Sequence, residues 1–369
     1  MATTFCKLLG TEYPIVAFSH CRDVVAAVSR AGGLGVLGAA KFTPDELETA
    51  LTWIDNNLQG RPYGVDVLAP PADGEADNID LEKLRQRIPA AHQDFVDQIA
   101  SKYHVPPLSE GAVPTEFAGV IINRRDLEAH IEVALRHPIR LLVSGLGPFS
   151  TEVVERTHAM GALVGGMCGS PIHAKRHVDS GADVVIAQGT EAGGHTGEIS
   201  TLVLVPQVVD AVAPIPVLAA GGIATGRQLA AVLALGAQGA WMGSAWLASE
   251  ESDVDPQVID KLLAAESNQT IRTRCMTGKT VRMLRTSFEN EWESPDAPGT
   301  LAAPLQGLLV LPLLKRAFKN RILPLMGQAV GQAVGLIRQR RTSRAIVDEM
   351  MVELVDTIER VREELELTQ

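Results

Sequence analysis

Short runs of apolar residues recur along the chain, and segments with the periodicity of amphipathic helices separate them. Apolar and polar positions do not alternate within these runs, so the residues are expected to be buried on both faces of a sheet. Burial on both faces is typical of parallel sheets that are covered by helices. The predicted strands are residues 14–18, 34–37, 63–68, 140–144, 162–166, 183–187, 216–220 and 239–242.

Helix signals lie between these strands. Thr43 is a candidate N-cap because Pro44 and Glu46 follow it, and Ser170 is another because it precedes Pro171. Eight repeats of strand and helix predict an α/β fold, a (β/α)8 TIM barrel, and a doubly wound sheet is the alternative. The predicted helices include residues 22–31, 43–57, 125–136 and 226–235, and a ninth apolar run, 118–122, is interpreted as leading into the third of them.

Two parts of the chain depart from a bare barrel. Residues 69–139 form a long insertion with an amphipathic helix near 81–100, and no strand pair of barrel type follows Ser252. Apolar residues between 346 and 361 are spaced for one helical face, which we expect to pack on the barrel or on a neighbouring subunit. The predicted division is a barrel at 1–250, a smaller, mostly helical domain at 251–340 on the substrate side, and a C-terminal amphipathic helix at 341–369.

Composition narrows the class of protein. With 46% hydrophobic and 21% charged residues the chain is not disordered, and a net charge of −11 argues against a nucleic-acid partner. The four cysteines have no CxxC spacing, so neither a zinc cluster nor a disulfide framework is expected, and a cytoplasmic location is predicted. We find no signal peptide, and the longest apolar stretch, 301–314, is interrupted and too short for a transmembrane segment.

Charge is unevenly distributed. Residues 297–347 hold eight basic side chains and no acidic one, on an otherwise acidic protein. This basic segment would either guide an anionic substrate or carrier, or form a solvated face that pairs with the acidic body or with a second subunit. The second interpretation is favoured.

Glycine-rich loops follow the last two predicted strands, where barrels frequently bind phosphate. Gly222 lies in the first of these loops and Gly243-Ser244 in the second, directly after Trp241-Met242. Glycines allow backbone N–H groups to approach a phosphate closely, and the serine hydroxyl is a further donor. The same glycines would also serve simple turns, but their pairing at neighbouring strand ends favours phosphate binding.

The loop after the sixth strand carries a candidate catalytic group. His195 lies among glycines there, and an imidazole at this place can accept a proton or polarise a developing anion. Gln188, at the strand end, suits the polar edge of a heterocycle, and Glu191 is either a general base or a carboxylate of the turn. His173 and His177 lie one helical turn apart but lack a third metal ligand, and Cys21 lacks an orienting partner for a reactive thiolate.

These segments resemble one enzyme family. AQGTEAGGHTG at 187–197 and AAGGIATGRQLAAVLALGAQGAWMGSAWLASEES at 219–252 are similar to the FMN-dependent nitronate monooxygenases, formerly called 2-nitropropane dioxygenases. Three further segments support the resemblance, which spans most of the chain: AAVSRAGGLGVLGA at 26–39, TGKTVRMLRT at 277–286 and GQAVGLI at 331–337.

The resemblance implies a TIM barrel with FMN as the cofactor. Its expected reaction is oxidation of an alkyl nitronate, such as propionate 3-nitronate, by dioxygen to a carbonyl compound and nitrite. His195 would be the catalytic residue. The cofactor would be bound by Gln188, Gly193, Gly222, Trp241, Met242, Gly243 and Ser244.

The chain departs from the family at two places in the same site. Where such proteins usually carry Ala-Pro-Met after the first strand, this one has Phe18-Ser19-His20, so Ser19 and His20 are expected beside the flavin. His20 would be a second acid-base group or a surface turn residue. Asp66 stands where the family commonly has an asparagine that holds the FMN phosphate, and its carboxylate would repel the phosphate unless it is shielded or protonated.

Two other functions stay open. Flavin enoyl-acyl carrier protein reductases share the EAGGH and AAGGI motifs, so an NAD(P)H-dependent reductase or dehydrogenase of enoyl or other acyl thioesters is an alternative. A non-catalytic flavin-binding protein is the other. The expected partners are thus a small anionic substrate or an acyl thioester, with O2 or NAD(P)H as redox partner, and a homodimer is a candidate assembly.

Overall fold

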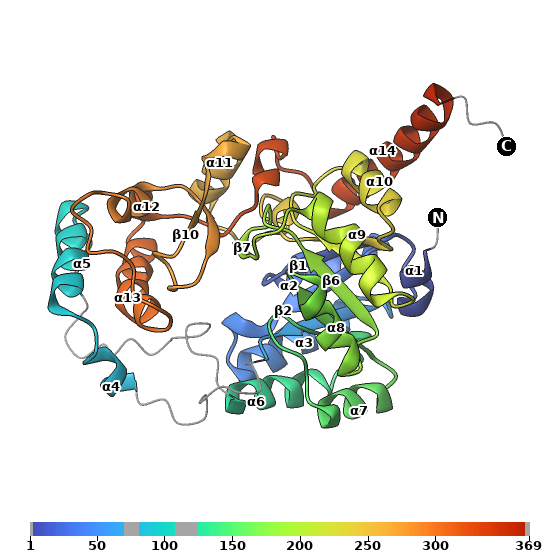
Figure 1. Ribbon diagram of the computed structural model, residues 1–369, viewed down its shortest axis with the longest axis horizontal. Helices are drawn as coiled ribbons and strands as arrows, with labels where there is room; N and C mark the ends of the chain where they lie inside the picture. The colour runs from blue at the N-terminus through green and yellow to red at the C-terminus, as the bar shows by residue number, and fades with distance from the viewer. Residues whose placement is uncertain (1–2, 70–80, 108–123, 366–369) are drawn as a thin grey trace.

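A computed structural model describes residues 3–69, 81–107 and 124–365. Eight parallel strands form a closed barrel in the order β1-β2-β3-β4-β5-β6-β8-β9 (Figure 1). This closure confirms the predicted (β/α)8 barrel and shows that the doubly wound alternative is wrong. The strands are β1 (Ile15–Ser19), β2 (Leu34–Gly38), β3 (Tyr63–Val67), β4 (Leu141–Ser144), β5 (Leu163–Cys168), β6 (Val184–Gln188), β8 (Val217–Ala220) and β9 (Gly239–Met242).

The barrel encloses a packed apolar interior. Val16, Val36, Val143 and Ile186 from four strands are fully buried there, in one cluster with Phe5 of the first helix. That helix, α1 (Thr4–Leu9), lies against the amino-terminal ends of the strands and closes that end of the barrel. The interior is therefore a core, and only the carboxyl end can hold a ligand.

Helices cover the outside of the barrel. The predicted capping residues are confirmed: Thr43 and Glu46 form a capping box, and the Ser170 hydroxyl accepts from the N–H of His173. The run at 118–122 lies outside the described residues. The helices are α2 (Arg22–Arg30), α3 (Pro44–Asn57), α6 (Arg124–Ala134), α7 (Thr151–Ala159), α8 (Pro171–Asp179), α9 (Thr201–Val212) and α10 (Gly226–Ala234).

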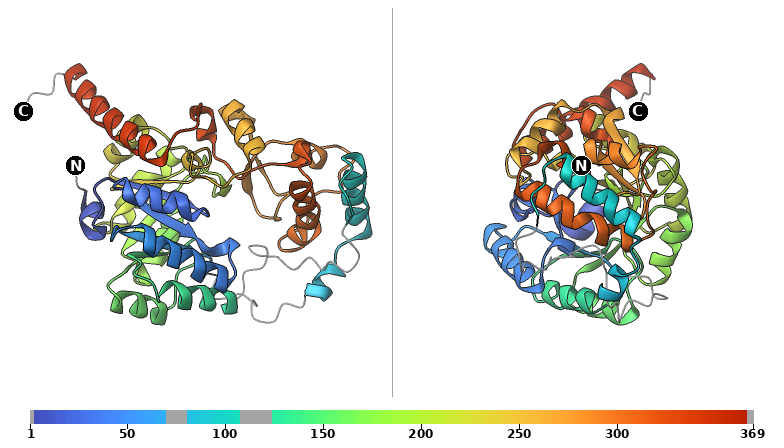
Figure 2. Two further views of the ribbon diagram at one scale, coloured as in Figure 1. Left: turned by 180° about the vertical axis from the view of Figure 1, so that it is seen from behind. Right: turned by 90° about the vertical axis from the view of Figure 1, so that its left-hand side faces the viewer.

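A second part of the molecule lies beside the carboxyl end of the barrel (Figures 1 and 2). It comprises α4 (Leu81–Arg85), α5 (Ala90–Lys102), α11 (Pro256–Ala264), α12 (Ser287–Trp292), α13 (Leu305–Lys319) and a three-stranded antiparallel sheet. Helix α5 comes from the insertion between β3 and β4, yet Val96 and Ile99 pack on Leu309 and Leu313 of α13. The smaller part therefore draws on two distant segments of the chain.

The three-stranded sheet links this part to the barrel. Its order is β10-β11-β7, with β10 (Thr270–Thr273) and β11 (Val281–Leu284) forming a hairpin. Strand β7 (Gly194–His195) belongs to the loop that follows β6 of the barrel, and His195 pairs with Val281. The apolar pattern did not predict this sheet, because β7 is only two residues long. The described residues also contain short 3-10 turns at Ala39–Lys41, Ser244–Trp246, Ser267–Gln269, Leu323–Leu325 and Gln332–Leu336.

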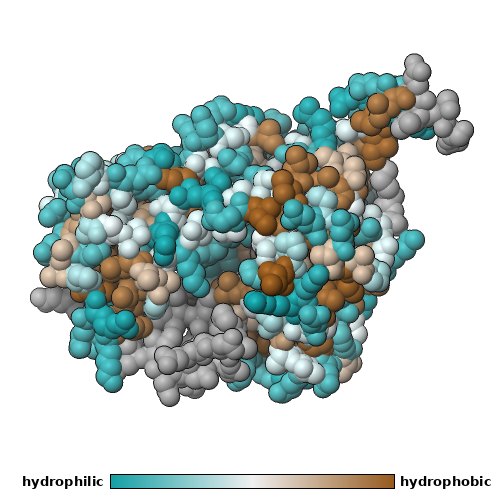
Figure 3. Space-filling view, viewed as in Figure 1, coloured by the Kyte–Doolittle hydropathy of each residue, from teal (hydrophilic) through white to brown (hydrophobic). Residues whose placement is uncertain are grey.

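The C-terminal helix α14 (Ser343–Glu364) packs on α10 and α2 through its first half. Its second half projects from the barrel, and apolar side chains there, such as Ile358 and Val361, are exposed (Figure 3). The described residues contain no helix that is both long and apolar enough to cross a membrane. The cytoplasmic location and the homodimer stay predictions.

The basic segment pairs mainly with the body of the protein. Arg338 contacts Glu266, and Arg344 contacts Asp348. Arg316 donates to the carbonyl of Pro106, and Arg340 to that of Ser249. These contacts favour the interpretation of the segment as a paired surface.

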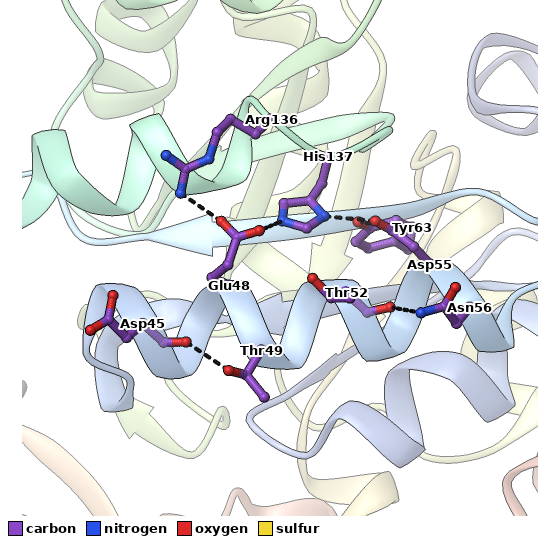
Figure 4. A network of polar contacts seen from close by, with 9 residues as sticks. All are labelled: Asp45, Glu48, Thr49, Thr52, Asp55, Asn56, Tyr63, Arg136 and His137. Carbon is purple, nitrogen blue, oxygen red and sulfur yellow. Dashed lines mark hydrogen bonds and ion pairs between the residues drawn. The ribbon is translucent and has the colours of Figure 1, made fainter.

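A buried histidine joins α3 to the segment before β4 on the outside of the barrel (Figure 4). Nδ1 of His137 lies 2.6 Å from Asp55 and its Nε2 lies 3.2 Å from Glu48. The Tyr63 hydroxyl also donates to Asp55, at 2.6 Å, and Arg136 contacts Glu48 at the exposed edge. Because His137 is buried, its loss would leave carboxylate oxygens without their donor.

We expect His137→Ala to lower the free energy of unfolding by about 1–3 kcal/mol, because it removes a buried ring together with its hydrogen bonds to two partly exposed carboxylates. Arg136→Ala is the matched control, since it removes an exposed partner of the same Glu48, and its effect should be clearly smaller. Urea denaturation of both variants measures the difference. Equal losses in the two variants would show that the buried His137 ring contributes no more to the free energy of unfolding than the exposed Arg136 does.

Candidate active site

The loops after β8 and β9, at the carboxyl end of the barrel, contain backbone N–H groups without a hydrogen-bond acceptor in the described part of the protein. Gly221 and Gly222 have positive φ angles of 104° and 72°, a conformation that only glycine adopts readily. Several backbone N–H groups in these two loops have no hydrogen-bond acceptor among the described residues. They are the N–H groups of Gly221, Gly222, Ile223, Gly243 and Ser244.

These amides fit the requirement of a bound phosphate. β8 and β9 are neighbours in the barrel, so both loops lie at the same rim. A helix begins next to the first loop, because Thr225 is the N-cap of α10. The first amides of α10 are themselves engaged, since the N–H of Gly226 donates to Glu353 and that of Gln228 to Thr225. The unpaired N–H groups are those of the two loops, and several such groups, with glycines that permit close approach, form an anion site.

A segment from late in the chain closes against the same loops. The N–H of Gly331 donates to the Ser244 hydroxyl at 2.8 Å, and the N–H of Gln332 donates to the carbonyl of Glu191 at 2.9 Å. A Cβ atom on Gly193 would lie 2.7 Å from the backbone of Val330 and Gly331. Gly193 is therefore needed for packing, and Ser244 accepts a hydrogen bond while its own proton stays free to donate.

Two residues hold the loop after β6: Glu191, for which a turn carboxylate was one of the two interpretations, and Arg282, which was not assigned a role from the sequence. The Glu191 carboxylate accepts from the N–H and the hydroxyl of Thr201, each at 2.9 Å, and so caps the start of α9. This contact favours the turn interpretation of Glu191 over that of a general base. The buried Arg282 guanidinium donates twice to the carbonyl of Thr190 and ties the loop to β11.

His195 is held on the three-stranded sheet at the edge of this loop. Its Nε2 lies 2.9 Å from the Thr277 hydroxyl, which belongs to the turn between β10 and β11. His195 is exposed at the edge of the sheet, and partial desolvation of its ring, together with the nearby ammonium of Lys279, lowers its pKa. The imidazole is therefore neutral at neutral pH. Thr277 and Lys279 lie in a segment that carries the family resemblance, but only the pairing of β7 with β11 shows that they lie beside His195.

Three further predicted residues line different sides of the barrel wall. Gln188 pairs with Ala220 at the top of the interior, and its side-chain amide has no hydrogen bond to a described residue. Trp241 faces the interior and stacks on Phe18, with ring centroids 6.0 Å apart. The side chain of Met242 points the other way, into the core between strands and helices, so only its backbone faces the rim.

The residues after β1 are engaged with the protein. The Ser19 hydroxyl accepts from the N–H of Cys21, and the Cys21 thiol donates to the carbonyl of Glu251. Burial raises the pKa of Cys21, which leaves no basis for a thiolate there. Nδ1 of His20 lies 2.8 Å from the carbonyl of Gly38, and burial lowers the pKa of His20 to about 4. His20 is thus a neutral hydrogen-bonding group.

Asp66 is buried at the top of the barrel interior, and its Oδ2 has no hydrogen-bond partner. Burial raises its pKa well above the usual range, which favours the protonated, neutral form of the carboxyl group. In the closed strand order β3 is adjacent to neither β8 nor β9. Asp66 therefore lies on a different side of the barrel from the loops after β8 and β9, and its raised pKa weakens the expected repulsion between its carboxyl group and a phosphate.

A metal centre has no support in the described ranges, where no group of three or more His, Cys, Asp or Glu side chains is placed to hold a metal ion. His177 is buried, and its Nε2 lies 3.1 Å from the carbonyl of Met167, which gives it a structural role.

Comparison with known proteins agrees with this geometry. The nitronate monooxygenase family model matches residues 3–353. A Mycobacterium tuberculosis protein named as a monooxygenase is 48% identical, over 97% of this chain and 98% of its own length. A Staphylococcus aureus protein named as a nitronate monooxygenase is 29% identical over 79% of this chain and 82% of its own.

Solved structures show the same architecture. The nitroalkane oxidase of Streptomyces ansochromogenes is 31% identical with a TM-score of 0.79, and covers 97% of this chain and 99% of its own. FabK of Thermotoga maritima is 27% identical with a TM-score of 0.73, over 99% of both chains. The barrel, the match over nearly the whole chain and these relatives show that the protein is an oxidoreductase that belongs to the nitronate monooxygenase family.

Proposed function

We propose that the protein is an FMN-dependent oxidoreductase that oxidises an alkyl nitronate, such as propionate 3-nitronate, with dioxygen to a carbonyl compound and nitrite. The observation that carries the proposal is the set of unsatisfied N–H donors after β8 and β9, at the same rim as the neutral imidazole of His195. When bound, FMN supplies the electron-transfer chemistry that no protein side chain offers.

The residues at this rim fit FMN. Gly221, Gly222, Gly243 and Ser244 would bind the phosphate through their N–H groups. Gln188, Ser19 and His20 would lie toward the ring system, with Trp241 below it, while Gly193 and Met242 would contribute through backbone. Asp66 would face the ring as a neutral acid, so it adds no negative charge beside the dianion.

His195 and Lys279 would act on the substrate. The Lys279 ammonium provides a positive potential next to the imidazole, which attracts an anionic nitronate. The neutral imidazole would hydrogen-bond the nitro group, or accept the α-proton when a neutral nitroalkane is bound.

A second candidate is an NAD(P)H-dependent reductase of enoyl or other acyl thioesters, which the similarity to FabK supports. Anaerobic flavin reduction discriminates between the two. Bleaching by nitronates, with aerobic turnover that needs no NAD(P)H, supports the nitronate proposal. Rapid bleaching by NADH or NADPH alone would contradict it in favour of the reductase. No reaction with either, despite stoichiometric FMN, would indicate a non-catalytic flavin-binding protein.

We expect His195→Ala to retain FMN and to lose turnover of a neutral nitroalkane by about 10²- to 10⁴-fold, the usual contribution of a general acid-base group, with a smaller loss for a nitronate, from which no proton is removed. Steady-state kinetics with propionate 3-nitronate and with a neutral nitroalkane measure the loss, and the flavin absorbance of the purified variant is the control for folding. Unchanged activity would remove His195 from the mechanism.

Gly222→Asp should abolish retention of FMN, because a carboxylate would intrude on the phosphate loop. The matched control is Gly161→Asp, since Gly161 has nearly the same φ, 73° against 72°, but lies in a distant turn with open space around its Cβ position. We expect this control to be yellow and the Gly222 variant to be colourless. A fully loaded Gly222→Asp protein would contradict the phosphate site.

Lys279→Ala should raise the pKa of His195, because the variant removes a cation that disfavours the protonated ring while burial remains. An NMR pH titration of the His195 ring measures the shift, and Arg274→Ala controls for a general change in the turn. A pKa that stays the same or falls would show that Lys279 does not act on the imidazole.

A further inference from the structure

The turn that contacts His195 is rigidly attached to the protein. Gly278 has a φ of 79°, and a Cβ atom there would lie 2.4 Å from the backbone N of Ala303. The fully buried Gln306 donates from its amide to the carbonyl of Cys275 at 2.7 Å and accepts from the N–H of Leu301 at 2.9 Å. The turn is therefore held against the start of α13, and the Thr277 hydroxyl has a defined position.

The Thr277 hydroxyl has one proton and three neighbours. Its Oγ1 lies 2.9 Å from Nε2 of His195, 3.3 Å from the carbonyl oxygen of Lys279 and 3.4 Å from the N–H of Lys279. The backbone N–H can only donate and the carbonyl can only accept. The tautomer of His195 decides the direction of the remaining contact.

The two tautomers differ in how many of these groups find a partner within the described residues. If Nε2 carries the proton, it donates to Oγ1, and the hydroxyl proton goes to the carbonyl of Lys279. If Nδ1 carries it instead, the hydroxyl must turn to Nε2, the Lys279 carbonyl loses its donor, and the Nδ1 proton has no acceptor among the described residues. The first arrangement forms more hydrogen bonds and is preferred.

No carboxylate takes part in orienting this histidine. Within the described chain, the Thr277 hydroxyl is the sole hydrogen-bond partner of the His195 ring, and Lys279 is the charged group that acts on it. A carboxylate partner would stabilise the imidazolium, whereas a hydroxyl selects a tautomer and leaves the ring neutral.

We infer that Thr277 is a positioning residue that holds His195 in the Nε2–H tautomer, so that Nδ1 is the atom that accepts the substrate proton. The role in turnover rests on the proposed function, while the tautomer itself does not. With a neutral nitroalkane, the α-proton moves to Nδ1 and the electrons of the broken C–H bond delocalise onto the nitro oxygens, which gives the nitronate without any oxidant.

The direct test is ¹⁵N NMR of the FMN-containing protein labelled with [¹⁵N]histidine, with His195→Gln to assign the signals. We expect a pyridine-type shift for Nδ1 of His195 and a pyrrole-type shift for Nε2. Thr277→Val, which keeps the shape but removes the acceptor, should move both shifts toward an averaged mixture of tautomers, and Thr277→Ser should restore the wild-type pattern. A pyrrole-type Nδ1 in the wild type, or no change in Thr277→Val, would overturn the inference.

Kinetics give an independent readout. Thr277→Val should lower kcat for a neutral nitroalkane by at least about tenfold, a part of what a general base contributes, with flavin content unchanged. The effect on preformed nitronate should be smaller, because no proton must be removed. Equal effects on both substrates would contradict the assignment of Nδ1 as the base. Should neither substrate turn over in the wild type, the proposed function fails, and the NMR shifts still decide the tautomer.

Discussion

The rim of the barrel depends on one close contact, between Gly193 in the loop after β6 and Gly331 late in the chain. Neither position has room for a side chain: a Cβ atom on Gly331 would lie 2.5 Å from the carbonyl oxygen of Glu191. The contact lets Gly331 donate to Ser244 and Gln332 donate to Glu191. It thereby couples the loop that carries His195 to the loop after β9.

Much of this fold follows from the sequence, and the reason is physical. All eight barrel strands were predicted within about two residues, because a strand that is buried on both faces must be apolar throughout. Because ligands bind at the carboxyl ends of barrel strands, the positions of Gly222, Gly243 and His195 after such strands predicted them as site residues.

The remainder of the site could not be derived in this way. Strand β7 is two residues long and pairs with a segment more than eighty residues away, so Thr277, Lys279 and Arg282 have no local signal that connects them with His195. The packing role of Gly193 and the capping role of Glu191 likewise depend on contacts across the fold. The side-chain direction of Met242 follows from the strand pleat, since it must oppose that of Trp241.

Burial, hydrogen bonding and a nearby cation together limit the negative charge that the protein presents at the site, where the Glu191 carboxylate is engaged by Thr201. Burial favours the neutral form of Asp66, His20 and His195 have lowered pKa values, and Lys279 adds a cation at the outer edge. Such a site suits a phosphate dianion held by backbone amides and a small anion as substrate, although the chain as a whole has a net charge of −11. The overall charge of a protein therefore does not predict the potential of its site.

The most direct test of this account compares the binding of FMN with that of riboflavin, which differs only in lacking the phosphate. Titration of the flavin-free protein, followed by flavin fluorescence, gives both dissociation constants. Two or more charge-assisted hydrogen bonds from the loops after β8 and β9 should make FMN bind at least about 100-fold more tightly than riboflavin. This ratio corresponds to a difference in binding free energy of about 3 kcal/mol. Equal affinity for the two flavins would contradict the claim that these backbone amides hold the cofactor.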